Sequence, residues 1–385
     1  MKQALHGFPV DSGISRKVVL SVIILILFLS LLPSTGGCMS ILPSKDNDSI
    51  SNLSFSHDGK KVVFDRCRNE GCQIQVYNLE TGELAAYESP HNERWTMGKY
   101  SYDGKRITFS VIPIKPNDDL ELGKMQIAVM DADGKNYKKV TTGPGAKLYP
   151  TFAHNGKKIL YACAARIREK GRTPAADYDA WEVDLGTGEQ KQLTFYEYFN
   201  MGNLTYFPDD ERFIFYGDRP SVFEGMRAYP NEEAFIAKMG ELKRQGKSIG
   251  GVVVMKGKEL VIPNPYNNYP PETFAKKPLL SKDGSVMIYE KSQSGKFYLY
   301  SADGNHRLAG EGGSIDAAAI SPDGNLLSMI SVGMLIKIFT IKDSEIQQNL
   351  YLSCTPRKIT NWNIPPNYKK FFKMIPEEPS HIINR

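Results

Sequence analysis

The chain has 385 residues, of which 41% are hydrophobic and 24% charged, a composition typical of a folded protein rather than a disordered one. Its net charge of +5 comes from Lys and Arg residues that are scattered along the chain. Because a nucleic-acid-binding protein concentrates such residues on one face, the sequence argues against a nucleic-acid partner.

Residues 1–37 have the pattern of a signal peptide. Arg16 and Lys17 precede a charge-free, mostly apolar run at 18–32. This run is shorter than the roughly 20 residues that a membrane-spanning helix needs, and it fits the hydrophobic core of a signal peptide. The sequence therefore predicts that the folded part of the chain is exported.

The small residues that precede Cys38 resemble the end of a bacterial lipoprotein signal. The resemblance implies that Cys38 is lipidated and becomes the mature N-terminus, with residues 38–50 as a tether to the membrane. Thr35 departs from the pattern, which prefers leucine at that position. Met39 in place of aspartate implies the outer membrane, or the periplasmic side of the envelope. The alternatives are an uncleaved signal that anchors the chain and an ordinary signal that is cut nearby.

Two cysteines in the exported part lie close together in the sequence. Cys67 and Cys72 bracket a turn-like tetrapeptide between two strand-like runs. Cysteines at matched hairpin positions can meet the spacing that a disulfide needs, and an exported chain meets an oxidising compartment. A disulfide is therefore predicted, with two reduced thiols as the alternative. The spacing does not fit a zinc site.

A stretch that begins at Ser54, SFSHDGKKVVF, returns along the chain. Each copy alternates apolar and polar residues on both sides of an Asp-Gly pair, an Asn-Gly pair or a substitute. Such pairs favour tight turns whose twist matches that of paired strands, so each copy is expected to form a β-hairpin. The copies lie at 54–64, 100–109, 151–161, 205–215, 279–289, 319–329 and, more weakly, 363–373.

A second hairpin follows most copies, for example at 73–84, 126–136, 180–190 and 297–305. Recurring units of four antiparallel strands predict the blades of an all-β propeller. A single blade would expose two apolar faces. Packing the blades around a ring buries those faces against the neighbouring blades, which explains why the stretch recurs.

The runs SPDG, SHDGKKVVF and VMDADGKNYKKVTTG resemble the repeats of TolB-like propellers, a subset of the WD-repeat-like class. The resemblance covers about residues 50–375 and implies one propeller domain at 51–385, while it says little about function. Six complete units are followed by the weaker hairpin at 363–373, which strands from both chain ends could complete. Seven blades are therefore predicted, with six blades and a tail as the alternative.

Consecutive strands of a blade run in opposite directions, so the two ends of the propeller differ. One end carries the turns within the hairpins. The other carries the connections between second and third strands and the crossovers between blades; we call it the crossover end. The insertions fall there, and the largest, 217–249, contains a predicted helix at 231–245 that starts at Asn231 and stops before Gly246.

Aromatic and basic residues gather in the connections of the crossover end. Tyr, Trp and Arg dominate the energetics of interfaces, and loops on a rigid scaffold are the usual place for binding. We therefore predict partner-binding roles for Arg94, Trp95, Arg166, Arg168, Tyr196, Tyr198, Tyr266 and Tyr269. The alternative is that the aromatic rings plug the axial channel and cap the blades.

The sequence contains no Gly-x-Ser-x-Gly elbow, no HExxH motif and no phosphate-binding loop. We therefore predict no catalytic residue, no metal and no cofactor. The predicted function is that of a non-catalytic lipoprotein of the cell envelope, held at a membrane by its lipid, that binds a protein, peptide or glycan. One alternative is an enzyme, a hydrolase or lyase, with an axial site gathered from several blades. Another is a structural subunit of an envelope complex.

Overall fold

The structure, a computed structural model, describes only part of the chain. The described residues are 49–68, 71–167, 175–217, 251–261, 275–291, 296–301, 306–311, 315–331, 335–340, 346–352, 372–375 and 381–383. They belong to the unit Asp46–Arg385, which is separate from Met1–Lys45. The signal peptide, Cys38 and the predicted helix at 231–245 lie outside the described residues. Within those residues, no helix has the length and apolar character that crossing a membrane requires.

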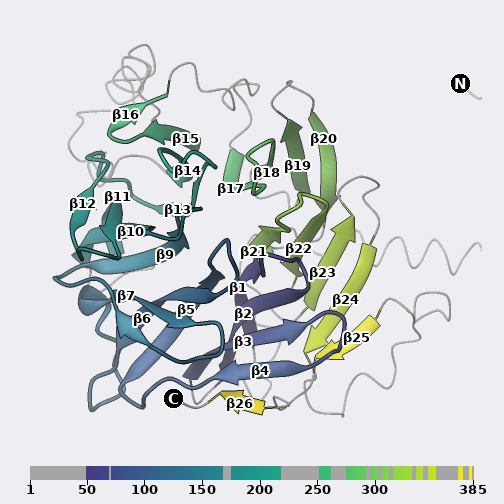
Figure 1. Ribbon diagram of the computed structural model, residues 1–385, viewed down its shortest axis with the longest axis horizontal. Helices are drawn as coiled ribbons and strands as arrows, with labels where there is room; N and C mark the ends of the chain where they lie inside the picture. The colour runs from purple at the N-terminus through teal and green to yellow at the C-terminus, as the bar shows by residue number, and fades with distance from the viewer. Residues whose placement is uncertain are drawn as a thin grey trace, which may run out of the picture. The chain divides into compact units, whose positions relative to one another are not determined.

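The strands form six sheets in chain order (Figure 1). The first sheet comprises β1 (Ser49–Phe55), β2 (Lys61–Arg68), β3 (Gly71–Asn78) and β4 (Leu84–Tyr87). The second comprises β5 (Glu93–Tyr100), β6 (Arg106–Pro113), β7 (Gln126–Asp131) and β8 (Lys138–Lys139), with the 3-10 helix η1 (Leu122–Lys124) before β7. The third comprises β9 (Ala146–Phe152), β10 (Lys158–Ile167), β11 (Ala175–Asp184) and β12 (Gln190–Gln192).

The other three sheets repeat this order in the second half of the unit. The fourth comprises β13 (Met201–Tyr206), β14 (Arg212–Gly217), β15 (Gly251–Lys256) and β16 (Glu259–Leu260). The fifth comprises β17 (Ala275–Leu280), β18 (Val286–Lys291), β19 (Lys296–Ser301) and β20 (His306–Glu311). The sixth comprises β21 (Ile315–Ile320), β22 (Leu326–Ser331), β23 (Leu335–Thr340) and β24 (Ile346–Leu352).

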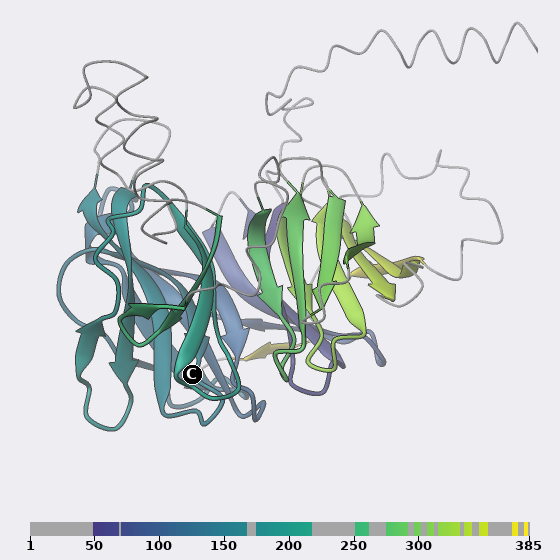
Figure 2. The same cartoon turned by 90° about the horizontal axis from the view of Figure 1, so that it is seen from above.

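The first strands of the six sheets close a ring. β1 contacts β5, β5 contacts β9, β9 contacts β13, β13 contacts β17, β17 contacts β21, and β21 returns to β1. These strands lie innermost in Figure 1, and Figure 2 shows the strands running between the two ends of the ring. Apolar side chains from neighbouring sheets share clusters, for example Val63 of the first sheet with Ile107 of the second. The predicted all-β propeller with four-stranded antiparallel blades is confirmed.

The prediction of seven blades is wrong, and the alternative of six fits the described strands. β25 (Phe372–Ile375) lies in the region assigned to the seventh blade, but it pairs in parallel with β24 at the outer edge of the sixth sheet. β26 (His381–Ile383) pairs in parallel with β4 at the edge of the first sheet. Existing edges thus supply the hydrogen bonds that these short strands need, which a separate hairpin of their own would supply poorly.

The Asp-Gly turns explain why the repeat folds as hairpins. In the first copy Ser56 Oγ donates a hydrogen bond to Asp58 Oδ1 at 2.6 Å, and Gly59 has a φ of 70°, a value that glycine adopts without strain. The same hydroxyl-to-carboxylate bond returns between Ser101 and Asp103 at 2.6 Å. In the fourth copy Asp210 takes the positive φ, at 55°, in place of glycine. The turn chemistry is therefore local to each repeat.

Each of the first four inner strands carries a bulge at one repeat position, where the pairing register shifts. The residue at this position has a positive φ in each case: Asn52, Met97, Tyr149 and Asn203. A bulge bends its strand and redirects the side chains near it. The bulges thus set how the inner strands face the axis of the ring.

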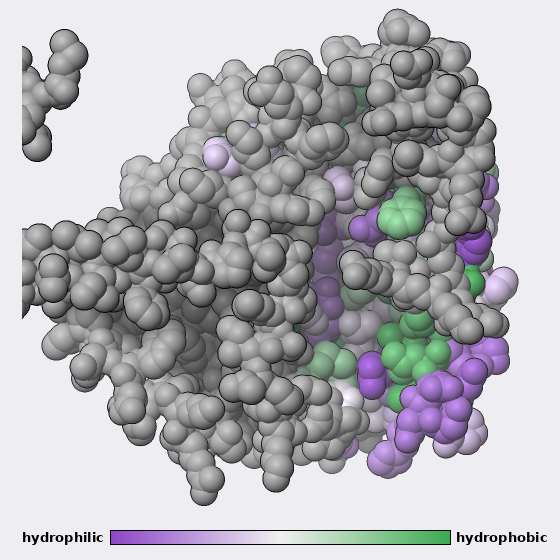
Figure 3. All heavy atoms as spheres, turned by 180° about the vertical axis from the view of Figure 1, so that it is seen from behind, coloured by the Kyte–Doolittle hydropathy of each residue, from purple (hydrophilic) through white to green (hydrophobic). Residues whose placement is uncertain are grey.

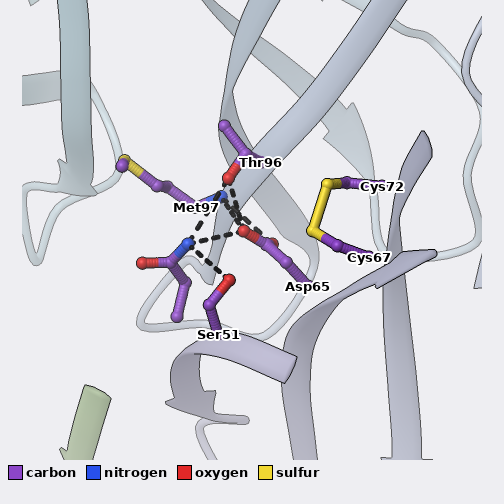
Figure 4. Close-up of a disulfide and its surroundings, with 7 residues drawn as sticks. Ser51, Asp65, Cys67, Cys72, Thr96 and Met97 are labelled. Carbon is purple, nitrogen blue, oxygen red and sulfur yellow. Dashed lines mark hydrogen bonds between the residues drawn. A yellow bond between two sulfur atoms is a disulfide. The ribbon is translucent and has the colours of Figure 1, made fainter. Parts of the chain in front are cut away.

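Asp65 on β2 fastens two of these bulges together (Figure 4). Its carboxylate accepts hydrogen bonds from the side-chain amide of Asn52 at 2.6 Å and from the hydroxyl of Thr96 at 2.5 Å. It also accepts from the backbone N–H of Met97 at 2.9 Å. Asn52 lies in the first sheet, while Thr96 and Met97 lie in the second. One buried carboxylate therefore links neighbouring blades beside the axis.

Candidate functional site

The inner strands line a cavity of about 230 Å³ on the axis of the ring. One side chain from each sheet, always at the same repeat position, lines it. These six residues, which we call the axial layer, are Ser54, Lys99, Thr151, Thr205, Leu279 and Ala319. Seen from behind, hydrophilic residues are visible between the uncoloured atoms near the centre of the ring (Figure 3). The turn signals of the repeat do not by themselves reveal this layer, although an alignment of the residues that precede each turn would have done so.

Lys99 is the axial layer's cation. Burial lowers the pKa of its ammonium group to about 8, because removal from water disfavours the charged form. Among the described residues, no hydrogen bond or ion pair joins the Lys99 side chain to another group. The described residues that line the cavity include no Asp and no Glu. The ammonium group is therefore a positive charge without a protein counterion in the described part of the chain.

Turn residues close one end of the axis. Tyr102 stacks on His154 with ring centroids 3.7 Å apart, and His154 Nε2 lies 3.1 Å from the carbonyl oxygen of Lys282. The backbone N–H of Lys282 in turn donates to the carbonyl oxygen of Pro322 at 3.3 Å. These contacts, which join the second, third, fifth and sixth sheets, form what we call the turn cap. The described rings that meet across the axis thus come from the hairpin turns, not from the aromatic crossovers considered in the sequence.

A groove of about 600 Å³ lies at the crossover end, between the first two sheets. Its walls come from the facing ends of β2 and β3, the crossover residues 88–91, the first two residues of β5 and the residue after β6, Ile114. Cys67 and Cys72 form a disulfide across the first of these walls (Figure 4). The Nε atom of Arg94 is buried and has no hydrogen-bond partner among the described residues. The Oε1 atom of Gln75, which also lines the groove, is likewise buried without a hydrogen-bond partner among the described residues. Because a buried polar atom normally has a partner, a ligand in this groove would satisfy a donor on Arg94 and an acceptor on Gln75.

Trp95 lies in the core and not on a binding face. It is 1% exposed, and its ring packs 4.6 Å from Phe109 and 5.0 Å from Tyr137, measured between centroids. Its Nε1 donates to Glu93 Oε2 at 3.1 Å. The sequence reading treated this segment as a crossover, whereas β5 already begins at Glu93. Side chains alternate along a strand, so Arg94 lines the groove while Trp95 faces the interior.

The aromatic crossover after β12 is also more buried than a binding surface requires. Tyr198 is fully buried, with its ring packed against Phe215 and its backbone bridged to Tyr178. Gly217 has no Cβ, and a Cβ there would lie 2.5 Å from the Tyr198 ring. Tyr196 is half-buried against Tyr198. Of these two tyrosines, only Tyr196 therefore keeps a surface that a partner could touch.

The remaining predicted partner-binding residues are dispersed. Arg166 on β10 pairs with Asp177 on β11, with Nε 2.8 Å from a carboxylate oxygen. Arg168, Tyr266 and Tyr269 lie outside the described residues, so their predicted roles stay predictions. Of the described members of the predicted set, only Arg94 lies in a groove, and these described members form no single aromatic cluster.

Asp179 on β11 holds the crossover that carries Tyr196. Its Oδ1 accepts from the hydroxyl of Thr194 and from the backbone N–H of Tyr196, both at 2.8 Å. Burial raises the pKa of Asp179 to about 6, although these hydrogen bonds act in the opposite direction. The pKa of Asp65 is also raised to about 6 by burial. Both carboxyl groups hold protein segments near the candidate sites in place through hydrogen bonds. We assign neither of them a contact with a ligand.

These raised pKa values predict that stability increases when the pH falls from 7 to 5. Between about pH 4 and pH 6, the folded chain binds protons on Asp65 and Asp179 that the unfolded chain does not bind. His154 opposes this change, because burial lowers its pKa. We expect a net gain of roughly 1 kcal/mol in the free energy of unfolding, measured by urea denaturation at the two pH values. An Asp179→Asn variant should gain less, and a loss of stability on acidification would contradict the prediction.

Groups suited to hold a metal are absent from the described part of the chain: no three or more His, Cys, Asp or Glu side chains gather there. The axial cavity contains one His, His57, from the first hairpin turn. Lys282 also lines the cavity, and its ammonium group donates to the carbonyl oxygen of Tyr102 at 3.4 Å. The described cavity therefore offers binding through Lys99 and through hydroxyl and amide donors, with a lysine as its candidate base.

Comparison with curated protein sequences gives a partial match. A stretch of 160 residues is 25% identical to dipeptidyl-peptidase 5 of Porphyromonas gingivalis and covers 40% of this chain and 22% of that protein. The match thus spans about a fifth of the length of that curated relative. No known family profile matches the chain.

Comparison with solved structures agrees with the fold. TolB from Acinetobacter baumannii superposes with a TM-score of 0.50 at 16% identity, over 80% of this chain and 64% of TolB. Oligogalacturonate lyase in complex with manganese superposes with a TM-score of 0.50 at 14% identity, over 78% of this chain and 77% of the lyase. The chain is a β-propeller. At these identities the likeness establishes the fold of the propeller, while the two neighbours include one enzyme and leave binding and catalysis as alternatives.

Proposed function

We propose that this propeller is a non-catalytic, exported lipoprotein, anchored through Cys38, that binds an envelope protein or peptide in the groove between its first two sheets. The observation that carries the proposal is the buried, unpartnered Nε of Arg94 in that groove. Arginine is the charged residue most often found at the centre of interfaces, where its guanidinium group pairs with carboxylates or carbonyl oxygens. A partner that offers such an acceptor would satisfy Arg94.

The two ends of the ring support this assignment. The turn cap closes the axis with contacts among its own turns, while the groove lies at the crossover end, where the chain connections are longer. The disulfide between Cys67 and Cys72 holds one wall of the groove and is the kind of bond that persists in an oxidising compartment. It therefore supports export as well as a preformed site.

The test places a photo-crosslinking amino acid at His91, an exposed residue of the groove, in the full-length chain in its native envelope. The control position is Asp133, in an exposed turn at the other end of the second sheet. We expect a discrete crosslinked product from position 91 and none from position 133. Equal products from both positions would contradict a binding site in the groove.

A charge-reversal substitution tests whether the proposed partner binds through Arg94. Arg94→Glu is expected to reduce the crosslinked product from position 91 about tenfold, the effect of losing one strong interface residue. Lys105→Glu, on an exposed hairpin turn, is the matched control and should leave the product unchanged. An Arg94→Glu variant that crosslinks as well as the wild type would show that the partner does not use this residue.

An axial enzyme is the second candidate, and the pKa of Lys99 favours it. A lysine with a pKa of about 8 is partly neutral near that pH and can accept a proton from a substrate. The lyase among the structural neighbours suggests oligogalacturonate as the first substrate to try. Elimination would create a double bond that absorbs ultraviolet light, and Lys99→Met should abolish the signal. If wild-type protein gives no signal, this candidate fails.

A further inference from the structure

The axial layer is divided into a polar and an apolar side. Ser54, Lys99, Thr151 and Thr205 come from the first four sheets, and Leu279 and Ala319 come from the last two. All six residues occupy the same repeat position, so the backbone of the hairpins does not create this division. It comes from the residue type that each repeat has at that position. Ser54 pairs across to Val63, Lys99 to Thr108 and Leu279 to Ile288, each in the same register.

The polar side offers hydrogen-bond donors that the described protein does not use. The hydroxyl groups of Thr151 and Thr205 and the amide of Asn203 line the cavity, and within the described residues none of them has a hydrogen-bond partner. Lys99 adds the charge. Unused donors from the third and fourth sheets and the ammonium group of Lys99 on the second sheet therefore line the same cavity, beside the contacts of the turn cap.

We propose that the axial cavity binds a small carboxylate with an apolar flank, in which the ammonium group of Lys99 pairs with the carboxylate and Leu279 and Ala319 contact the flank. The proposal concerns a site separate from the groove of Arg94 and does not depend on a partner there. The ligand is either a free short-chain acid or the C-terminal carboxylate of a chain that enters from the crossover end.

Charge and size favour a carboxylate over a phosphate. Phosphate sites usually combine an Arg fork, a helix N-terminus or a nest of backbone N–H groups, and a doubly charged ligand needs more than one cation. Two lysines line the cavity, but the ammonium group of Lys282 donates to the carbonyl oxygen of Tyr102 at 3.4 Å. The ammonium group of Lys99, with hydroxyl and amide donors beside it, therefore suits a ligand with a single negative charge. The cavity volume of about 230 Å³ is enough for several water-sized groups, so it accommodates a small acid or a chain end.

The experiment measures binding to the purified full-length chain in a neutral detergent by titration calorimetry at pH 7. The probes are pentanoate, acetate, which lacks the apolar flank, and pentanol, which lacks the charge. A short peptide ending in a free leucine carboxylate, compared with its C-terminal amide, separates a chain end from a free acid as the source. We expect saturable binding of pentanoate, weaker binding of acetate and no saturable binding of pentanol.

Variants at Lys99 give the decisive readout. Lys99→Met should weaken pentanoate binding at least about tenfold, while Lys99→Arg retains the charge and most of the affinity. Lys61→Met, at an exposed lysine of β2, is the control and should bind as the wild type does. Unchanged binding to Lys99→Met, or equal binding of pentanoate and pentanol, would overturn the proposal.

The pH profile distinguishes an ion pair from a structural effect. Burial places the pKa of Lys99 near 8, so raising the pH from 7 to 9.5 removes the ammonium group and should weaken binding to the wild type. Lys99→Arg should show no such loss, because a guanidinium group stays charged over this range. The absence of saturable pentanoate binding at pH 7 would also overturn the proposal, while leaving the crosslinking result at the groove unaffected.

Discussion

Replacing Asp65 with alanine is expected to lower the free energy of unfolding by about 3 kcal/mol. The substitution leaves the amide of Asn52, the hydroxyl of Thr96 and the backbone N–H of Met97 without the acceptor that they share. A buried donor that loses its partner costs on the order of 1 to 3 kcal/mol. The loss is partly offset, because the ionised carboxylate is itself unfavourably buried, as its raised pKa shows.

Urea denaturation at pH 7, followed by circular dichroism, measures this effect. Asp65→Asn retains one acceptor oxygen and should lose about half as much stability as Asp65→Ala. Asp133→Ala, at an exposed turn, is the control and should change the free energy of unfolding by less than about 0.5 kcal/mol. A loss below about 1 kcal/mol for Asp65→Ala would mean that the contact between the first two sheets does not depend on this carboxylate.

Replacing Trp95 with alanine is expected to lower the free energy of unfolding by about 4 kcal/mol, a magnitude typical of removing a large buried aromatic side chain. The ring fills the space beside Phe109 and Tyr137 in the core cluster between the first two sheets. Its removal also takes one hydrogen-bond donor from Glu93. Trp95→Phe keeps part of the ring contact and should cost roughly 1 to 2 kcal/mol.

This measurement separates the core role of Trp95 from the partner-binding role predicted from the sequence. Denaturation is best followed by circular dichroism, because the substitution removes one of the chain's three tryptophans. If Trp95 is a core residue, Trp95→Phe folds and retains the crosslinked product from position 91. A Trp95→Ala variant as stable as the wild type that fails to bind a partner would instead restore the sequence-based interpretation.

Arg94, the residue before Trp95, shows that adjacent residues of one strand can belong to the groove and to the core. Arg94 and Trp95 are adjacent on β5, yet one lines the groove and the other packs in the interior. From the sequence, both residues are expected to lie within a crossover, and both belong to types that are common at interfaces. Only the start of β5 at Glu93 and the direction of the strand assign them to opposite sides.

Local signals in the sequence were sufficient for the hairpins and for the propeller. Ser56, Asp58 and Gly59 form a turn through contacts within a few residues, and such turn chemistry can be read without knowledge of the fold. The disulfide between Cys67 and Cys72 could likewise be predicted from local sequence, because the two cysteines occupy matched positions of one hairpin. The repetition of such units, each with two apolar faces, then requires a ring, because no unit can bury both faces alone.

The tertiary structure decided what depends on residues far apart in the chain. β25 and β26 joined the edges of existing sheets, and no local pattern indicates which edge a short strand will pair with. The burial of Tyr198 depends on the missing Cβ of Gly217, and the turn cap depends on His154 meeting Tyr102 and Lys282. Lys99 becomes a candidate binding residue only when six strands converge on one axis and bury it. That burial, and not the residue type, lowers the pKa of Lys99.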